Sequence, residues 1–278
     1  MDVQEYLLRI GCSRSFLCAP TLDTLRFLHL QHLLTVPFED LTIHTGDRVS
    51  LKLQLIYDKI VFRKRGGFCY ENNGLFSWLL SQLGFKVVIL SAQVKSRITG
   101  CYGPPFDHLI MMVTLDGERW LCDVGFGPGF QLPLLLETET PQTQSHGVYR
   151  VRTHGNLRFV ETKSDDGSSW VELYKFNLQP CLREDFTTMC EYHQTSINSV
   201  FFCKSLCSLL LPNGRITLMG RNLITTRLSG EGGPPVKTTK TDLSDEEIIQ
   251  ILREKFRIIL MSPLIVKDQD IVPPPVNY

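Results

Sequence analysis

The 278-residue sequence lacks an excess of charge of either sign, since 29 lysines and arginines balance 29 aspartates and glutamates. A chain without net charge has no broad electrostatic surface for nucleic acid or anionic lipid, so we expect neither nucleic acid nor a membrane as a partner. Internal repeats and low-complexity segments are lacking as well, which excludes fibrous, coiled-coil and disordered classes. With 43% hydrophobic residues, the chain has the composition of a globular protein with a sizeable core.

Long hydrophobic runs are also scarce. The longest, residues 258–266, contains Ser262 and Pro263 and is too short to span a bilayer. The opening MDVQEYLLRI lacks the basic start and apolar stretch of a secretory leader. Nine scattered cysteines, an odd number, do not resemble the dense disulfide framework of a small secreted protein. We therefore expect a cytoplasmic protein in which at least one thiol is free.

Hydrophobic spacing predicts a helical bundle over residues 1–85. Apolar side chains recur three and four residues apart, as on one face of a helix. The expected helices cover residues 3–10, 22–36, 50–65 and 69–83. Thr21 can cap the second helix, Ser50 opens the third, and the fourth starts near Cys69.

From residue 86 the pattern changes to a period of two, which predicts a β-barrel or strongly curled sheet over residues 86–190. The expected strands cover residues 86–94, 108–115, 119–124, 148–153, 157–162 and 170–177. Residues 191–278 form a mixed α/β lid in this interpretation. A short helix over residues 184–192 leads into it, with strands near 200–203, 214–219 and 222–228 and a last helix that the capping box Ser244–Glu247 begins. The predicted fold class is α+β.

Cys69 stands out among the cysteines because it follows Gly66-Gly67 and begins a helix. The glycines allow a close approach of the backbone, and a helix N-terminus stabilises a thiolate, so we expect a lowered pKa for Cys69. A cysteine needs less activation than other nucleophiles. The alternative is a buried core cysteine, the commoner fate of cysteines in general.

The hairpin around Asp116-Gly117 predicts where two further polar side chains lie. A two-residue turn pairs Leu115 with Glu118, so His108 and Asp123 become diagonal neighbours on one face, about 7–8 Å apart between backbones. That spacing suits a carboxylate that orients an imidazole, which then serves Cys69. A slip of one residue in the register would destroy the arrangement.

Four motifs together resemble the arylamine N-acetyltransferase family. They are Val36-Pro-Phe-Glu39, Arg65-Gly-Gly-Phe-Cys69 with Asn73, His108 before an apolar strand, and Asp123-Val-Gly-Phe-Gly127. The resemblance covers nearly the whole chain. It implies a helical bundle, a β-barrel and an α/β lid around a papain- or transglutaminase-like core that carries a Cys69–His108–Asp123 triad.

The resemblance also implies an activity: transfer of acetyl from acetyl-CoA, as co-substrate, to aromatic amines and hydrazines by a ping-pong route through a thioester on Cys69. Phe38, Val94, Asp107 and Phe126 are the candidate amine-binding residues. Pro104, Pro105, Tyr192 and Asn198 are the candidate CoA-binding residues. Glu39 and Arg65 resemble the family's buried ion pair, and Asn73 completes the expected structural support.

A cysteine hydrolase of the amidase or protease type is the alternative function, since the order Cys, His, Asp along the chain fits both reactions. The local cathepsin-like signature around the cysteine is absent. A catalytically silent binding protein is a third possibility, which an intact triad disfavours. We expect no metal, because neither Cys190–His193 nor Cys203–Cys207 has a paired knuckle, and we expect a monomer.

Overall fold

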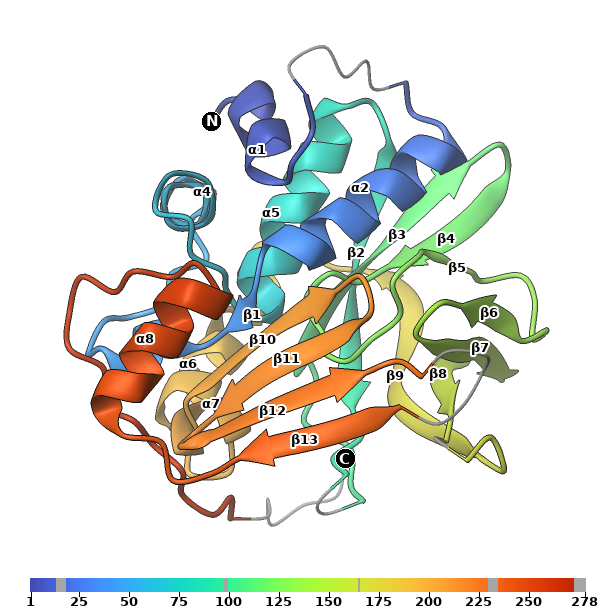
Figure 1. The fold of residues 1–278 in the computed structure, drawn as a ribbon. Coiled ribbons are helices and arrows are strands. Elements are labelled where there is room, and N and C mark those ends of the chain that lie inside the picture. The colour runs from blue at the N-terminus through green and yellow to red at the C-terminus, as the bar shows by residue number, and fades with distance from the viewer. Residues whose placement is uncertain (14–18, 98–99, 165, 230–234, 273–278) are drawn as a thin grey trace.

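The structure is a computed structural model that describes residues 1–13, 19–97, 100–164, 166–229 and 235–272. The fold is of the predicted α+β class (Figure 1). The N-terminal helices lie beside a curled eight-stranded sheet, and a second, five-stranded sheet is flanked by the last helix. Among the described residues, no helix is long and apolar enough to cross a membrane.

Three of the four predicted N-terminal helices are confirmed: α1 (Val3–Arg9), α2 (Leu22–Thr35) and α5 (Cys69–Gln82). The starts of α1 and α2 follow from side-chain caps, since the Thr21 hydroxyl accepts a hydrogen bond from the Thr24 N–H and Asp2 caps α1 in the same way. The apolar faces of the three helices meet in one cluster, in which Tyr6, Leu28 and Phe76 are fully buried. Burial of these faces accounts for the packing of short helices that would be marginal in isolation.

The third predicted helix differs from the expectation in both its start and its winding. Helix α4 (Leu53–Tyr57) begins at Leu53 and continues as a π-helical turn, Asp58–Phe62. The Ser50 hydroxyl accepts a hydrogen bond from the Lys52 N–H, so it closes a turn ahead of the helix. Two further short elements, β1 (Phe38–Glu39) and α3 (Leu41–His44), were not predicted.

The larger sheet contains the predicted strands in the order β5-β4-β3-β2-β9-β8-β7-β6. Its strands are β2 (Lys86–Val94), β3 (His108–Leu115), β4 (Glu118–Cys122), β5 (Leu134–Leu135), β6 (Gln142–Gln144), β7 (Gly147–His154), β8 (Leu157–Lys163) and β9 (Trp170–Pro180). The two- and three-residue strands β5 and β6 were not predicted, because periodicity needs at least four residues to be seen.

The predicted hairpin register is confirmed. Leu115 pairs with Glu118 and Met111 with Cys122 across β3 and β4. Asp116 and Gly117 have φ of 50° and 86°, the left-handed pair that a tight hairpin turn requires. Strand β4 ends at Cys122, so Asp123 is the first residue after the strand and lies outside its hydrogen-bond ladder.

The second sheet has the order β1-β10-β11-β12-β13. It consists of β10 (Leu206–Leu211), β11 (Gly214–Met219), β12 (Asn222–Arg227) and β13 (Val236–Lys240), and β1 joins it through the pair Phe38 and Ser208. This pairing ties the segment before the nucleophile helix to the C-terminal third of the chain. The division at residues 85 and 190 stays a prediction.

The helices of the last third confirm one expectation and correct another. Helix α8 (Asp245–Lys255) has the predicted capping box between Ser244 and Glu247. A 3-10 turn (Arg183–Phe186) and α6 (Thr187–Thr195) match the predicted short helix. The strand predicted near residues 200–203 is wrong: α7 (Val200–Cys203) lies there, because the Ser199 hydroxyl accepts from the Phe201 N–H and starts a helical turn.

Candidate active site

Cys69 is the first residue of α5 and only 2% exposed. The two glycines before it are needed for close approach, as predicted. A Cβ on Gly66 would overlap the Pro37 carbonyl oxygen, and a Cβ on Gly67 would lie 2.5 Å from the Glu71 Cβ. The chain can therefore enter α5 against β1 only with glycine at these two positions.

His108 and Asp123 meet as the hairpin register predicts. Nε2 of His108 lies 2.7 Å from Oδ2 of Asp123, and both residues are 2% exposed. Burial tends to raise the pKa of Asp123, but the interaction with His108 and hydrogen bonds from His108, Asn73 and Gly125 outweigh it, so the pKa lies below its usual value. Asp123 is therefore a carboxylate that accepts and orients the imidazole.

Asn73 links the helix of the cysteine to the strand of the histidine. It lies one turn after Cys69 on α5, so the two side chains share a face of the helix. Its Nδ2 donates to Oδ1 of Asp123 at 2.8 Å and to the Leu109 carbonyl at 2.7 Å, and its Oδ1 accepts from the Val124 N–H at 2.8 Å. Asn73 thus fixes the distance between α5 and the residues beside His108.

The loop after β4 passes directly over the start of α5. A Cβ on Gly125 would lie 2.8 Å from the Cys69 Cα and 2.7 Å from Nδ2 of Asn73. The Gly125 N–H also donates to Oδ1 of Asp123 at 2.9 Å. Glycine at this position lets Asp123 and Cys69 lie in the same small space.

The expected lowering of the Cys69 pKa is wrong for this closed site. Burial raises the pKa of the Cys69 thiol well above its usual value; the Leu109 backbone amide opposes this rise, and the charges of Asp107 and Asp123 add to it. The partial charge at the start of α5 is outweighed because water is nearly excluded from the sulfur. A reactive thiolate here needs a proton acceptor beside it.

Two aromatic rings, those of Phe126 and Tyr174, pack against the His108 imidazole. The Phe126 ring lies 5.5 Å from the His108 ring and 5.3 Å from the Tyr174 ring, and Tyr174 lies 5.3 Å from His108. Burial, and then the nearness of Asp123, raises the pKa of Tyr174 well above its usual value. Among the described residues its buried hydroxyl has no hydrogen-bond partner of standard geometry. The Tyr174 side chain was not singled out in the sequence, because its strand position carries no signal for a site.

The other ring of the expected aromatic wall, Phe38, packs against Gly127. A Cβ on Gly127 would lie 3.6 Å from Cδ1 of Phe38, and the Phe38 ring is 5.9 Å from that of Phe201. Phe38 is 9% exposed, whereas Phe126 is half-buried. The two rings therefore border the same glycine-rich segment from different elements.

The segment before His108 is held in a strained conformation. Phe106 has φ of 65°, which is unusual for a bulky residue. The Tyr70 hydroxyl lies 2.7 Å from the Phe106 carbonyl oxygen, and the Phe106 N–H donates to Ser91 Oγ at 3.1 Å. These contacts support the turn that carries Pro104 and the exposed Pro105 toward the start of β3.

Both carboxylate oxygens of Asp107, a candidate amine-binding residue, already have partners within the protein. Its Oδ2 accepts from the Val94 N–H at 3.0 Å, and its Oδ1 lies 3.4 Å from Nε2 of His193. Nδ1 of His193 in turn lies 2.8 Å from Ser199 Oγ. His193, on α6, was considered in the sequence only as a metal ligand. The contact with Asp107 has no sequence signal because 86 residues separate the two.

The two candidate CoA-binding residues from the last third lie near this histidine. The Tyr192 ring is 5.5 Å from that of His193. Asn198 lies six residues further, in the turn between α6 and α7, and its Nδ2 donates to the Val272 carbonyl at 2.7 Å. The Tyr192 ring thus packs against that of its chain neighbour His193, and the Asn198 amide holds the C-terminal segment.

Glu39 and Arg65 form the expected buried ion pair behind the site. Arg65 Nε donates to Oε1 of Glu39 at 2.9 Å, and Lys59 Nζ lies 3.8 Å from the same oxygen. Burial tends to raise the pKa of Glu39, but the charges of Arg65 and Lys59 and the hydrogen bonds outweigh it and lower the pKa to about 2. The pair fixes the backbone of β1, because Glu39 also accepts from the Leu41 N–H at 2.8 Å.

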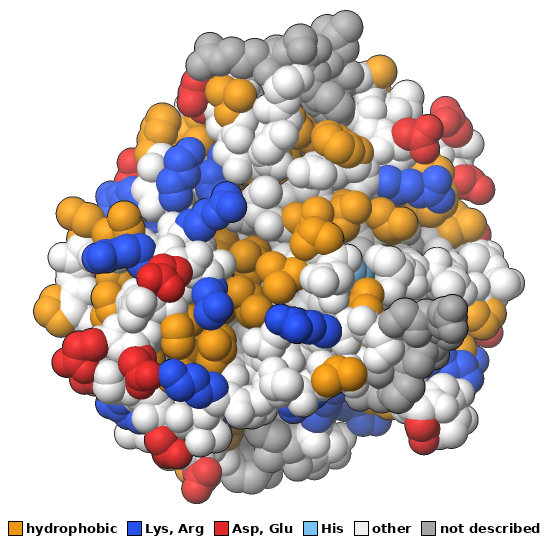
Figure 2. Space-filling view, viewed as in Figure 1, with side chains coloured by type: hydrophobic (Ala, Val, Ile, Leu, Met, Phe, Trp, Pro, Cys, Tyr) orange, Lys and Arg blue, Asp and Glu red, His pale blue; other side chains and the backbone are white. Residues whose placement is uncertain are grey.

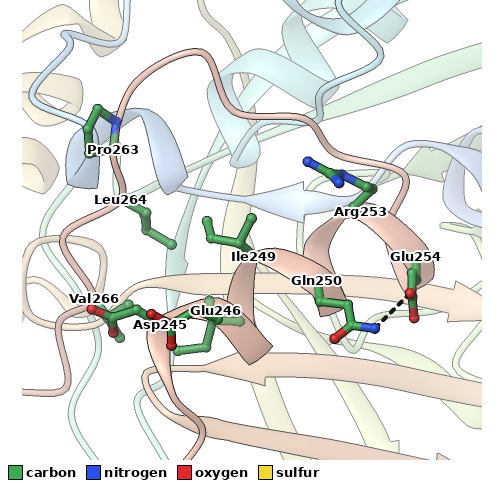
Figure 3. Close-up of a pocket in the computed structure, with 10 residues that line it drawn as sticks. Asp245, Glu246, Ile249, Gln250, Arg253, Glu254, Pro263, Leu264 and Val266 are labelled. Carbon is green, nitrogen blue, oxygen red and sulfur yellow. Dashed lines mark hydrogen bonds between the residues drawn. The ribbon is translucent and has the colours of Figure 1, made fainter.

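An open groove of about 650 Å³ lies elsewhere, between α8 and residues 263–266 (Figure 3). Within the described residues, its lining includes none of Cys69, His108 and Asp123. Gln250 donates to Glu254 at 2.9 Å inside it, and on this part of the surface hydrophobic side chains alternate with both charges (Figure 2). No group of three metal-binding side chains occurs in the described part of the chain.

The fold and the site define an α+β protein with a papain-like core. The N-acetyltransferase family model matches residues 21–265. Arylamine N-acetyltransferase 1 of Homo sapiens is 36% identical over 97% of this chain and 98% of its own, and a pineal gland isozyme of Gallus gallus is 36% identical over 94% and 95%. A structure of the Mycobacterium marinum arylamine N-acetyltransferase in complex with CoA has a TM-score of 0.82 and 30% identity, covering 92% and 93% of the two chains. The chain belongs to the arylamine N-acetyltransferase family and is an acyltransferase.

Proposed function

We propose that this acyltransferase moves an acetyl group from acetyl-CoA to aromatic amines and hydrazines through a thioester on Cys69. Two observations support the proposal: the Cβ position of Gly125 lies 2.8 Å from the Cα of the buried Cys69, and hydrogen bonds join Asp123 to Gly125, His108 and Asn73. The CoA complex of the similar Mycobacterium marinum enzyme supports acetyl-CoA as the donor. We also propose a cytoplasmic location.

In the first half-reaction, Nδ1 of His108 accepts the proton of the Cys69 thiol, because Nε2 is engaged with Asp123. The sulfur forms a bond to the acetyl carbonyl carbon of acetyl-CoA, and the carbon–sulfur bond to CoA breaks. The proton held by His108 passes to the leaving CoA thiolate. Asp123 stabilises the imidazolium during this transfer and keeps the ring in one orientation.

In the second half-reaction, the uncharged amine nitrogen attacks the thioester carbonyl. His108 takes a proton from the attacking nitrogen, the Cys69 sulfur leaves, and it recovers its proton from the imidazolium. An apolar site favours the uncharged amine over the ammonium form. We assign the amine contacts to Phe38, Val94, Asp107 and Phe126, and the CoA contacts to Pro104, Pro105, Tyr192 and Asn198.

The burial of Cys69 gives His108 a larger role than the sequence indicates. Because burial raises the pKa of the thiol, the resting site favours a neutral sulfur, and the nucleophile forms when the proton moves to the imidazole. A transferred proton creates an ion pair beside Asp123, whose carboxylate offsets the new positive charge. The proposed triad therefore works as a unit.

Initial-rate kinetics test the proposed function. Acetyl-CoA and 4-chloroaniline are varied together, and parallel double-reciprocal lines are the expected result for a ping-pong route. Intersecting lines would contradict the thioester. Rapid release of acetate without amine, at a rate equal to that of amine acetylation, would favour the cysteine hydrolase instead.

A further inference from the structure

His29 of α2 lies outside the triad but touches its backbone. The side chain is fully buried and comes from a helix whose other inward residues are mostly apolar. Its Nδ1 lies 2.7 Å from the Gln131 carbonyl oxygen, and the Asp123 N–H lies 3.1 Å from its Nε2. A residue 94 positions earlier in the chain therefore contacts the residue that orients His108.

The partners determine the tautomer of His29. A carbonyl oxygen only accepts and a backbone N–H only donates, so Nδ1 carries the proton and Nε2 carries the lone pair. Burial lowers the pKa of His29 to about 4, although the Gln131 carbonyl and Asp123 oppose the shift. The imidazole is therefore neutral at pH 7, and both hydrogen bonds persist.

Asp123 and Gln131, the two hydrogen-bond partners of His29, are the ends of one irregular segment. Residues 123–131 contain no helix or strand, and Phe126 lies within them. The His29 ring also stacks on Phe130 at 5.7 Å with an interplanar angle of 10°. Gln131 is buried and anchored on its far side by Gln144, whose Oε1 accepts from its N–H at 2.7 Å. One side chain thus holds both ends of the segment and stacks on a ring in it.

We propose that His29 is a positioning residue that sets the place of Asp123 relative to His108 and the shape of the Phe126 segment. This inference rests on the proposed function, because it assigns His29 a role through Asp123. The hydrogen bond to the Asp123 N–H serves both half-reactions, since it fixes the backbone from which the carboxylate reaches Nε2 of His108, and His108 moves the proton in each. The hydrogen bond to Gln131 serves the second half-reaction alone, since it fixes the segment that presents Phe126.

Two amide substitutions separate the two hydrogen bonds. His29→Gln places an amide oxygen near the position of Nε2 and can keep the Asp123 N–H satisfied, while it loses the Gln131 contact. His29→Asn places an amide nitrogen near the position of Nδ1 and can keep the Gln131 contact, while it leaves the Asp123 N–H without an acceptor. His32→Leu is the matched control, because His32 is a fully buried imidazole on the same helix that contacts Tyr6 at 3.0 Å.

The measurement is the rate of Cys69 acetylation by acetyl-CoA, followed by quench and mass spectrometry, together with the rate of transfer to 4-chloroaniline. His29→Asn should slow both acetylation and transfer about tenfold, because both steps use the His108–Asp123 pair. His29→Gln should acetylate Cys69 near the wild-type rate and slow only the transfer to the amine. His32→Leu should lower the melting temperature with little change in either rate. Equal slowing of both steps in His29→Gln, or no slowing of either step in either His29 variant, would overturn the proposal.

The tautomer of His29 offers a second test, which uses the wild-type protein and does not depend on the folding of a variant. Nitrogen-15 NMR of the intact wild-type protein should show Nδ1 of His29 protonated and Nε2 bare. The opposite tautomer would overturn the proposal whatever the kinetics. If wild-type Cys69 takes no acetyl group while the NMR tautomer is as expected, the proposed function fails and the role of His29 in it fails with it, although the geometry around His29 stands.

Discussion

Nε2 of His108 lies 2.7 Å from Oδ2 of Asp123, so Nδ1 is the ring nitrogen left for the proposed proton exchange with Cys69. Asp123 is held in turn by Asn73, Gly125 and His29, which donate to its carboxylate or accept from its backbone. The imidazole is therefore oriented by a carboxylate that has little freedom to move.

Cys69→Ser should fold like the wild type but retain less than about a few per cent of the transfer rate. A serine hydroxyl is far less acidic than a thiol, and His108 cannot remove its proton as readily in a buried site. Steady-state acetylation of 4-chloroaniline measures the loss. Cys181→Ser, which changes a half-buried thiol after β9, should retain full activity. Retention of most activity in the Cys69 variant would refute the nucleophile assignment.

Asp123→Asn should lower the rate of Cys69 acetylation by at least about 100-fold. An amide can donate to Nε2 of His108 and so favour the tautomer that protonates Nδ1, which then cannot accept the thiol proton. Rapid-quench mass spectrometry of the acetyl-enzyme gives the rate. Asp23→Asn, at a side chain that is 96% exposed, is the control. A normal rate in the Asp123 variant would show that the carboxylate does not serve the imidazole.

The sequence predicts the His108–Asp123 contact because both residues belong to one hairpin, whose turn residues and alternation determine the register. Helix α5 is likewise predictable from Gly66-Gly67 and the apolar spacing that follows. The contacts of His29 with Asp123 and of His193 with Asp107 join residues from distant elements, and no local pattern encodes them. The raised pKa of Cys69 depends on burial by several elements and was missed for the same reason.

Short elements show the same limit. Strand β1 has only two residues and exists because β10 pairs with it, and α7 replaces a predicted strand because Ser199 caps a turn. The apolar run around residues 200–211 is compatible with a helix or a strand on composition alone. Tertiary pairing decides between helix and strand: the start of the run forms α7 (Val200–Cys203), and its end forms β10 (Leu206–Leu211).

Phe126→Ala should raise the KM for the aromatic amine or lower kcat/KM, while acetylation of Cys69 stays near the wild-type rate. A well-placed ring pair contributes about 0.5–1.5 kcal/mol beyond the area it buries, which corresponds to a change of about two- to tenfold. Stopped-flow or quench measurements separate the two half-reactions. Phe62→Ala, at a ring that is 58% exposed, is the control.

Equal loss in both half-reactions of Phe126→Ala would assign the ring a different role. The Phe126 ring lies 5.5 Å from that of His108, so its removal can also loosen the imidazole. The amine-pocket assignment would then have to be abandoned, and Phe126 would count as support for the triad.

Glu39 should make stability depend on pH below about pH 5. Its pKa falls from the usual 4.5 to about 2 in the folded protein, so its contribution is present above pH 4.5 and is lost as the pH falls toward 2. The shift corresponds to about 3 kcal/mol. Urea unfolding at a series of pH values should show this loss in the wild type and a shallower slope in Glu39→Gln.

Glu39→Gln should also be destabilised at pH 7 by about 3–5 kcal/mol, since Arg65 and Lys59 lose the charge they face in a buried site. Glu137→Gln is the control, because its ion pair with Arg119 is exposed. The same acid slope in wild type and in Glu39→Gln would mean that other carboxylates dominate acid unfolding.

Mass spectrometry of the protein after incubation with acetyl-CoA alone tests the thioester on Cys69 most directly. We expect one added acetyl group, located on the peptide that contains Cys69. Addition of 4-chloroaniline should remove it, with one acetylated amine formed for each acetyl group removed. An unmodified Cys69, or an acetyl group that the amine does not remove, would show that the reaction does not pass through a thioester on Cys69.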